Sequence, residues 1–307
     1  MLRRTLLALT GLVTLLAVCA PAQAAEKYPV PYTFTTSAVL AGAQVDGNAP
    51  GSNRWSCRPS RRHPRPVVLV HGTGGNRNTN WQTYAPLLAN HGYCVFALTY
   101  GVAPGTPPGM DQVGGMTRME RSARQLRSFV ARVLRVTGAR KVDLVGHSQG
   151  TLMPDYWLKF LGGAGKVHDY ISLAPLWHGT GGSDAMASLA RASGYDEAAT
   201  PVCGACLQME TGSEFLRRLR AGGLAVPGVH YTNIVTKYDE LVTPYTSGIQ
   251  RGMRNVVVQD RCARDYSDHL ELAADPVAAA IVLNALDPKH PRPVPCRLVL
   301  PVNGSLR

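Results

Sequence analysis

Short, wholly apolar runs alternate along the chain with longer segments that carry apolar residues at helical spacing. The run at 67–70, Val-Val-Leu-Val, is typical of a strand that is buried on both faces. Similar runs predict strands at 93–99, 141–145, 170–174, 229–235 and 255–259, and helical patterns predict helices at 81–90, 117–136, 151–161 and 273–286. This alternation predicts an α/β fold with a mostly parallel, doubly wound sheet and helices on both faces.

Two segments interrupt the alternation. Residues 25–65 are rich in Pro, Gly, Ser and Asn, and we expect an extended N-terminal arm that wraps the core. A second stretch, rich in Gly, Ala and Ser, separates two of the predicted strands, and long insertions above a rigid sheet tend to be functional. We therefore predict a cap insertion at about 179–228 within one domain that spans 25–307.

The first 24 residues have the composition of an export signal. Arg3 and Arg4 precede an apolar run at 5–20, and Ala22-Gln-Ala24 resembles a cleavage site for small residues. The apolar run is shorter than the roughly 20 residues that span a bilayer, and no later segment approaches that length. We predict a secreted, extracellular protein with a signal peptide at 1–24 and no transmembrane segment.

Six cysteines remain after the predicted signal peptide, and an even number in an exported chain favours disulfides. Six cysteines allow 15 connectivities, and the sequence alone does not choose among them. We favour pairing in order along the chain. A redox or zinc-binding role for the Cys-Gly-Ala-Cys segment is the alternative, but no second such motif accompanies it. The six residues are Cys57, Cys94, Cys203, Cys206, Cys262 and Cys296.

The formal net charge is +12, which is attractive to anionic partners in principle. Many of the arginines lie on the predicted helix at 117–136, opposite its apolar stripe, and this pattern is typical of a solvated face. No nucleic-acid-binding motif is present, so we expect no nucleic-acid partner.

The strongest chemical signal is Gly146-His147-Ser148-Gln149-Gly150, placed between a predicted strand and a predicted helix. A serine hydroxyl becomes a useful nucleophile when a sharp turn exposes it to a base, and the flanking glycines permit such a turn. Ser148 is therefore the candidate nucleophile.

A serine nucleophile needs a base and a carboxylate that orients the base. Asp239 follows the predicted strand at 229–235, and His269 follows the strand at 255–259. Both would lie at the carboxyl edge of the sheet, in the chain order Ser, Asp, His. Glu240 is the alternative acid. The rival histidines at 168 and 230 fall at strand starts, and the one at 178 only precedes the insertion.

The loop His71-Gly-Thr73-Gly-Gly follows the first predicted strand and is suited to an oxyanion hole. We expect the backbone N–H groups of Thr73 and Gln149 to be the donors, with the Thr73 hydroxyl as a further candidate. Neither glycine-rich segment of the chain fits a nucleotide-binding motif. No cofactor and no metal are expected for the reaction.

This ordered set resembles the secreted class 2 lipases of the α/β-hydrolase superfamily over roughly residues 50 to 300. The resemblance rests on Gly72-Thr73-Gly74, Ser148-Gln149-Gly150, the Asp239 loop that ends in Pro244, and His269 seven residues after Cys262. It implies an α/β-hydrolase fold, the triad of Ser148, Asp239 and His269, and the donors Thr73 and Gln149. The chain departs from the pattern at His147, where a lipase of this family has a tryptophan.

These observations predict a secreted, monomeric serine hydrolase that cleaves carboxylic esters, most of all acylglycerols, and that meets its lipid or ester substrate at a lipid–water interface. An esterase for soluble, aromatic or polymeric esters is the alternative, and an inactive binding protein of the same fold is the alternative from another class. In the cap, Met186 and Leu189 are the candidate contacts for the acyl chain.

Overall fold

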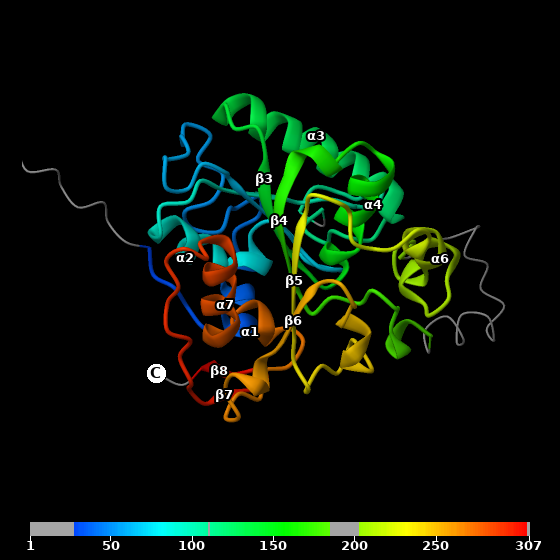
Figure 1. The fold of residues 1–307 in the computed structure, drawn as a ribbon. Helices are drawn as coiled ribbons and strands as arrows, with labels where there is room; N and C mark the ends of the chain where they lie inside the picture. The colour runs from blue at the N-terminus through cyan, green and yellow to red at the C-terminus, as the bar shows by residue number, and fades with distance from the viewer. Residues whose placement is uncertain (1–27, 110, 185–202, 306–307) are drawn as a thin grey trace, which may run out of the picture.

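The computed structural model describes residues 28–109, 111–184 and 203–305. Its centre is a six-stranded sheet in the order β2-β1-β3-β4-β5-β6 (Figure 1). All neighbouring strands in it are parallel, so the predicted doubly wound sheet is confirmed. The strands are β1 Val67–Val70, β2 Val95–Leu98, β3 Val142–His147, β4 Val167–Leu173, β5 His230–Val235 and β6 Arg254–Val257, and a small antiparallel pair follows, β7 Val299–Leu300 and β8 Gly304–Ser305.

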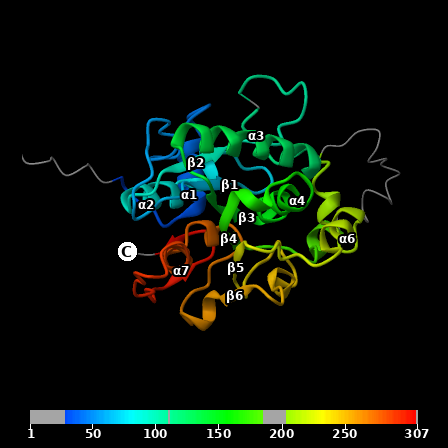
Figure 2. The same ribbon diagram turned by 45° about the horizontal axis from the view of Figure 1, so that its top comes forward.

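Helices cover both faces of the sheet. The described α-helices are α1 Phe34–Gly42, α2 Tyr84–Asn90, α3 Met119–Thr137, α4 Met153–Phe160, α6 Glu214–Arg220 and α7 Pro276–Leu286. Short 3₁₀ turns join them, at Thr79–Trp81, Ser148–Thr151, Ala164–Lys166, Leu207–Met209, Tyr245–Gly248, Val258–Asp260 and Glu271–Ala273. Figure 2 shows α3 and α4 on one side of the sheet and α7 on the other.

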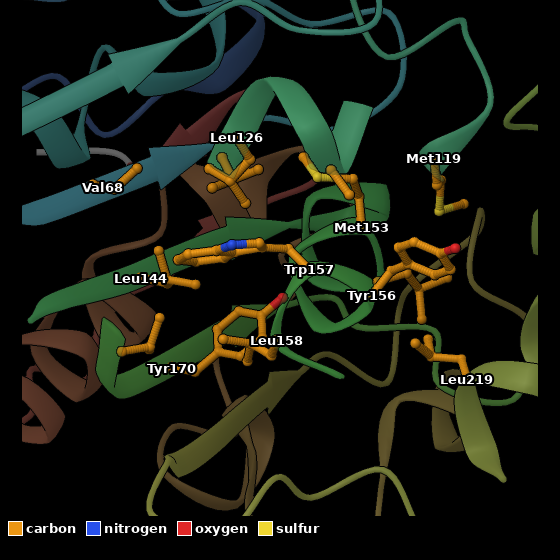
Figure 3. Packing of buried hydrophobic residues seen from close by; sticks show 14 of the residues in the cluster. Val68, Met119, Leu126, Leu144, Met153, Tyr156, Trp157, Leu158, Tyr170 and Leu219 are labelled. Carbon is orange, nitrogen blue, oxygen red and sulfur yellow. The ribbon is translucent and has the colours of Figure 1, made fainter. Parts of the chain in front are cut away.

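The apolar runs of the strands serve two separate cores because successive side chains point to opposite faces. Val68 of β1 joins the core beneath α3, α4 and α6, to which these helices contribute Leu126, Trp157 and Leu219 (Figure 3). Leu69 belongs to the other core, which α2 and α7 close. The sheet is therefore buried on both sides, and its loops at the strand ends are where polar side chains can reach solvent.

Two α-helices begin at later residues than the sequence predicts. The last helix begins at Pro276 and not at Ala273, because the Asp275 carboxylate accepts the N–H of Ala278 at 2.9 Å and proline suits the first helical turn. The serine helix likewise starts as a 3₁₀ turn and becomes α-helical only at Met153.

The prediction of a wholly extended N-terminal arm is wrong, because α1 lies within it. No side chain caps α1 locally. Its first N–H instead donates to the Glu271 carboxylate, which lies 237 residues further on, at 2.9 and 3.0 Å from Phe34 N. The helix therefore depends on a tertiary contact that a local pattern does not contain.

Candidate active site

Ser148 occupies a strained turn between β3 and the helix that follows. Its φ is +55°, in the left-handed region that costs a non-glycine residue about 1–2 kcal/mol. The turn needs its two glycines because a Cβ at Gly146 would collide with the Gly150 carbonyl oxygen, and a Cβ at Gly150 with the Val70 carbonyl oxygen. The Gly-x-Ser-x-Gly motif thus forms the predicted strand-to-helix turn, at the carboxyl edge of the sheet.

Asp239 and His269 come from the loops after β5 and β6 and form a buried pair. Their side chains are 2% and 3% exposed, and His269 Nδ1 lies 2.9 and 3.0 Å from the two Asp239 carboxylate oxygens. The Asp239 carboxylate also accepts the N–H groups of Leu241 at 3.1 Å and Val242 at 2.7 Å. These backbone donors hold the carboxylate in one orientation, so the carboxylate in turn orients the imidazole ring.

Glu240, the alternative acid, has a different partner. Its carboxylate accepts the backbone N–H of His269 at 3.1 Å, whereas the imidazole nitrogen faces Asp239. The geometry therefore favours Asp239 as the partner of the ring, with Glu240 as a brace for the loop that carries His269.

Ser148, His269 and Thr73 all line one cavity of about 550 Å³. Much of the remaining wall is apolar, and it is supplied by Phe34 and Ala38 of α1 and by Leu176, Met209, Leu241 and Val242. Met209 belongs to the predicted cap insertion, whose apolar residues are expected to contact the acyl chain. The contributions of α1 and Leu176 are not predicted from the sequence; the only local signal for α1 is a threonine, Thr33, before a short run containing apolar residues.

The loop that carries Thr73 is fixed from several sides. Gly74 N–H donates to the Gly114 carbonyl at 2.9 Å, Gly114 N–H donates to the Gly75 carbonyl at 3.0 Å, and Gly72 N–H donates to Asn80 Oδ1 at 3.2 Å. In the part of the chain that the structure describes, no backbone carbonyl accepts the Thr73 N–H.

The other expected oxyanion donor is the N–H of Gln149, in the first turn of a helix, where backbone N–H groups have no intrahelical acceptor and the helix dipole favours negative charge. The Thr73 hydroxyl donates to the side-chain Oε1 of Gln149 at 2.6 Å, which ties the two residues together. The two expected donors thus come from adjacent segments that are joined directly.

Two further histidines, His71 and His147, lie beside the cavity but are unsuited to act as bases. Burial lowers the pKa of His71 to about 4, and its Nε2 accepts the N–H of Tyr100 at 3.2 Å. Burial, with the nearby His269, lowers the pKa of His147 to about 3, and its Nε2 bonds the backbone carbonyl of His269 at 3.0 Å. Both rings are neutral near pH 7, so neither competes with His269 for a proton.

The rival histidines are not among the described residues that line the cavity. His168 and His230 are at the amino ends of β4 and β5, far along the strands from the Ser148 edge, as the strand assignments predict. Met186 and Leu189, the candidate acyl contacts, and the predicted signal peptide lie outside the described residues.

The cysteines are joined in order along the chain, as the favoured set has them. The pairs are Cys57–Cys94, Cys203–Cys206 and Cys262–Cys296. Cys206 also lines the cavity, so the short loop that the second pair closes is part of the wall. None of the helices in the described segments is both long and apolar enough to cross a membrane.

This chain has the α/β-hydrolase fold. In a doubly wound sheet, a serine in a left-handed turn after a strand, together with a buried His–Asp pair at the same edge, is typical of that fold. The sequence assigns the chain to one family within this fold. Residues 64–282 match the model of the class 2 lipases, and the chain belongs to that family.

Solved structures agree on the fold. The chain is similar to Aspergillus fumigatus lipase B, with a TM-score of 0.58 and 23% identity over 80% of this chain, and it spans only 61% of the Aspergillus protein. It is also similar to the mature form of the Bacillus licheniformis lipase BlEst2, with a TM-score of 0.55 and 17% identity over 80% of this chain and 96% of that one.

Proposed function

We propose that the chain is a secreted serine lipase that hydrolyses carboxylic esters, acylglycerols above all, through an acyl-serine intermediate. The observation that carries the proposal is the buried His269–Asp239 pair, which shares one cavity with Ser148 in a member of a lipase family. No metal or cofactor takes part in the proposed reaction.

Each side chain has one task in this mechanism. Ser148 Oγ attacks the ester carbonyl carbon while His269 Nε2 takes the hydroxyl proton, and Asp239 keeps the other ring proton on Nδ1 and stabilises the imidazolium that forms. The N–H groups of Thr73 and Gln149 bind the oxyanion of the tetrahedral intermediate. His269 then protonates the leaving alcohol, and a water molecule activated by the same ring releases the acid.

The preference for lipid esters is supported by the cavity wall and its surroundings. Leu241 and Leu270 line the cavity and are partly exposed, and α1, which supplies Phe34 to the wall, presents Val39 and Leu40 with 70% of each exposed. An acyl chain that enters such a cavity gains about 0.8 kcal/mol per buried CH₂. In this proposal the cap at about 179–228, with Met186 and Leu189, selects among acyl chains.

Replacing the nucleophile tests the mechanism. Ser148→Ala should abolish ester hydrolysis while the protein stays folded, and a fluorophosphonate should label Ser148 in the unaltered enzyme. Ser183→Ala is the matched control, because Ser183 is a second serine on the cavity wall. Retention of more than about a thousandth of the wild-type kcat by Ser148→Ala would contradict the assignment.

A chain-length profile tests the substrate class. Hydrolysis of long-chain acylglycerol emulsions should exceed that of acetate and butyrate esters in kcat/KM. Equal or better hydrolysis of short, dissolved esters, above and below their aggregation limit, would assign the enzyme to soluble esters instead.

A further inference from the structure

Two histidines and a carboxylate meet at the amino ends of β4 and β5, at the opposite edge of the sheet from Ser148. Asp169 of β4 and His230, the first residue of β5, are direct partners in the parallel register, and His168 precedes Asp169. His168 Nδ1 lies 2.9 Å from Asp169 Oδ2, and His230 Nδ1 lies 3.3 Å from Asp169 Oδ1. Each imidazole therefore faces its own oxygen of the same carboxylate.

The three candidate ligand atoms have the spacing of a small coordination site. All of them lie within 4.8 Å of one another. With Zn–N and Zn–O bonds of about 2.0–2.2 Å, tetrahedral ligands are about 3.3–3.6 Å apart. The side chains of His168 and His230 are 35% and 67% exposed, so the two rings have room to shift to these separations around an ion.

A second observation concerns the nitrogen of His168. Although it lies 2.9 Å from Asp169 Oδ2, its orientation does not make a hydrogen bond, and the atom is buried without a hydrogen-bond partner among the described residues. A buried ring nitrogen is normally satisfied by a hydrogen bond. A metal ion bound to both the nitrogen and the carboxylate would satisfy it, with the two atoms moved apart from 2.9 Å to about 3.3–3.6 Å.

The surroundings hold Asp169 in place. Arg65 donates to Asp169 Oδ2 at 2.8 Å and to Asp143 Oδ1 at 2.6 Å, and Asp143 also accepts the Asp169 N–H at 3.1 Å. These contacts fix the carboxylate that the two imidazoles face.

We propose that His168, Asp169 and His230 form a zinc site, with the fourth position filled by water from the adjoining cavity of about 870 Å³. Two imidazoles and one carboxylate suit Zn²⁺, whereas Mg²⁺ and Ca²⁺ take oxygen ligands. The ion joins the amino ends of two neighbouring strands, so it stabilises the sheet and takes no part in ester hydrolysis. The proposal does not depend on the identity of the nucleophile or of the substrate.

Calorimetric titration of the chelator-treated protein with ZnCl₂ at a pH above 7 tests the site. The protein should bind one Zn²⁺ per chain, and its melting temperature should rise with zinc. His168→Ala and His230→Ala should each weaken binding at least tenfold and remove the thermal shift. Both changes replace side chains that are at least partly exposed, and unchanged circular dichroism would show that each variant folds.

Two controls separate this site from other imidazoles. His290→Ala should bind zinc as the wild type does, because His290 Nδ1 has a carboxylate partner, Asp287 at 2.8 Å, but belongs to no group of three candidate metal ligands among the described residues. His269→Ala, at the other edge, should also retain binding. The proposal is overturned if His168→Ala/His230→Ala binds zinc with unchanged affinity, if His269→Ala abolishes binding, or if the wild type binds none at about 1 mM.

Discussion

Two edges of one sheet each bring a histidine nitrogen to 2.9 Å from an aspartate oxygen, in very different surroundings. At the carboxyl edge, His269 and Asp239 are both buried, and two backbone N–H groups fix the carboxylate. At the amino edge, Asp169 is shared by His168, His230 and Arg65, and both rings are partly open to solvent.

The difference shows that a His–Asp contact does not define a function by itself. A buried carboxylate with one imidazole partner holds that ring in one tautomer and orientation, as a general base requires. A carboxylate shared between two partly exposed rings leaves ring nitrogens free to coordinate an ion. We therefore propose that the two edges of the sheet have different chemistry. Substituting the corresponding aspartate at each edge should affect ester hydrolysis at one edge and zinc binding at the other.

The largest expected effect comes from removing the charge at the carboxyl edge. Asp239→Asn should lower kcat about 10⁴-fold, because an amide neither fixes the required tautomer of His269 nor stabilises the imidazolium. The same change at the amino edge, Asp169→Asn, should weaken zinc binding and spare kcat. Steady-state kinetics and zinc titration of both variants check the pair.

Glu240→Gln is the control for this prediction. The glutamine retains an oxygen that can accept the His269 N–H, so kcat should fall far less than in Asp239→Asn. If Glu240→Gln were the more damaging change, Glu240 and not Asp239 would be the acid.

The disulfides extend the comparison to stability. Cys57–Cys94 ends one residue before β2, at the amino edge, and closes 37 residues, whereas Cys203–Cys206 closes only 3 and lies at the cavity. Loop-closure entropy predicts that replacing Cys57 and Cys94 by serine lowers the free energy of unfolding by about 4 kcal/mol, against about 2 kcal/mol for the shorter bridge.

Denaturant unfolding and kinetics of the two double variants measure this difference. The change at Cys57 and Cys94 should leave kcat unchanged, and the change at Cys203 and Cys206 should alter KM because Cys206 lines the cavity. A larger stability loss for the shorter bridge would show that native contacts at the cavity, and not loop length, decide the order.

The sequence predicts the catalytic edge better than the rest of the molecule. Ser148 is marked by its own glycines, and Asp239 and His269 follow apolar strands in a fixed chain order, so local pattern and topology suffice. The amino edge differs, because the meeting of His168 with His230 depends on the register of β4 against β5.

Other details depend on contacts that no local pattern contains. The helix α1, which supplies Phe34 and Ala38 to the cavity, begins where the distant Glu271 carboxylate accepts its first N–H. The distinction between Asp239 and Glu240 is of the same kind, because both side chains have bonds to His269, one to the ring and one to the backbone. Neighbouring acids with different tasks are distinguished only by orientation.

An effect smaller than the loss of the longer disulfide is expected at a buried carboxylate that lacks an imidazole partner. Asp155 of α4 accepts the hydroxyl of Tyr231 at 2.6 Å through Oδ1, while its Oδ2 has no hydrogen-bond partner among the described residues. Burial raises the pKa of Asp155 from 3.8 to about 7, against the opposing influence of Tyr231 and Lys159. Asp239, in contrast, has three donors for the same kind of carboxylate.

The raised pKa sets the sign of a pH effect. The folded protein binds the proton more tightly than the unfolded chain, so the contribution of Asp155 to stability is fully present below about pH 4 and is lost as pH rises through 7. Between pH 5 and pH 8 this loss amounts to about 3 kcal/mol.

Asp155→Asn has no such proton to lose, and its amide oxygen can still accept the Tyr231 hydroxyl. The variant should therefore gain stability over the wild type as the pH rises, as measured by urea unfolding at both pH values. Other buried carboxyls such as Asp143 and Glu271 titrate in both proteins, so the difference between the two curves isolates Asp155. Parallel curves would mean that Asp155 is ionised in the folded protein throughout this range, with a partner for Oδ2 such as a bound water.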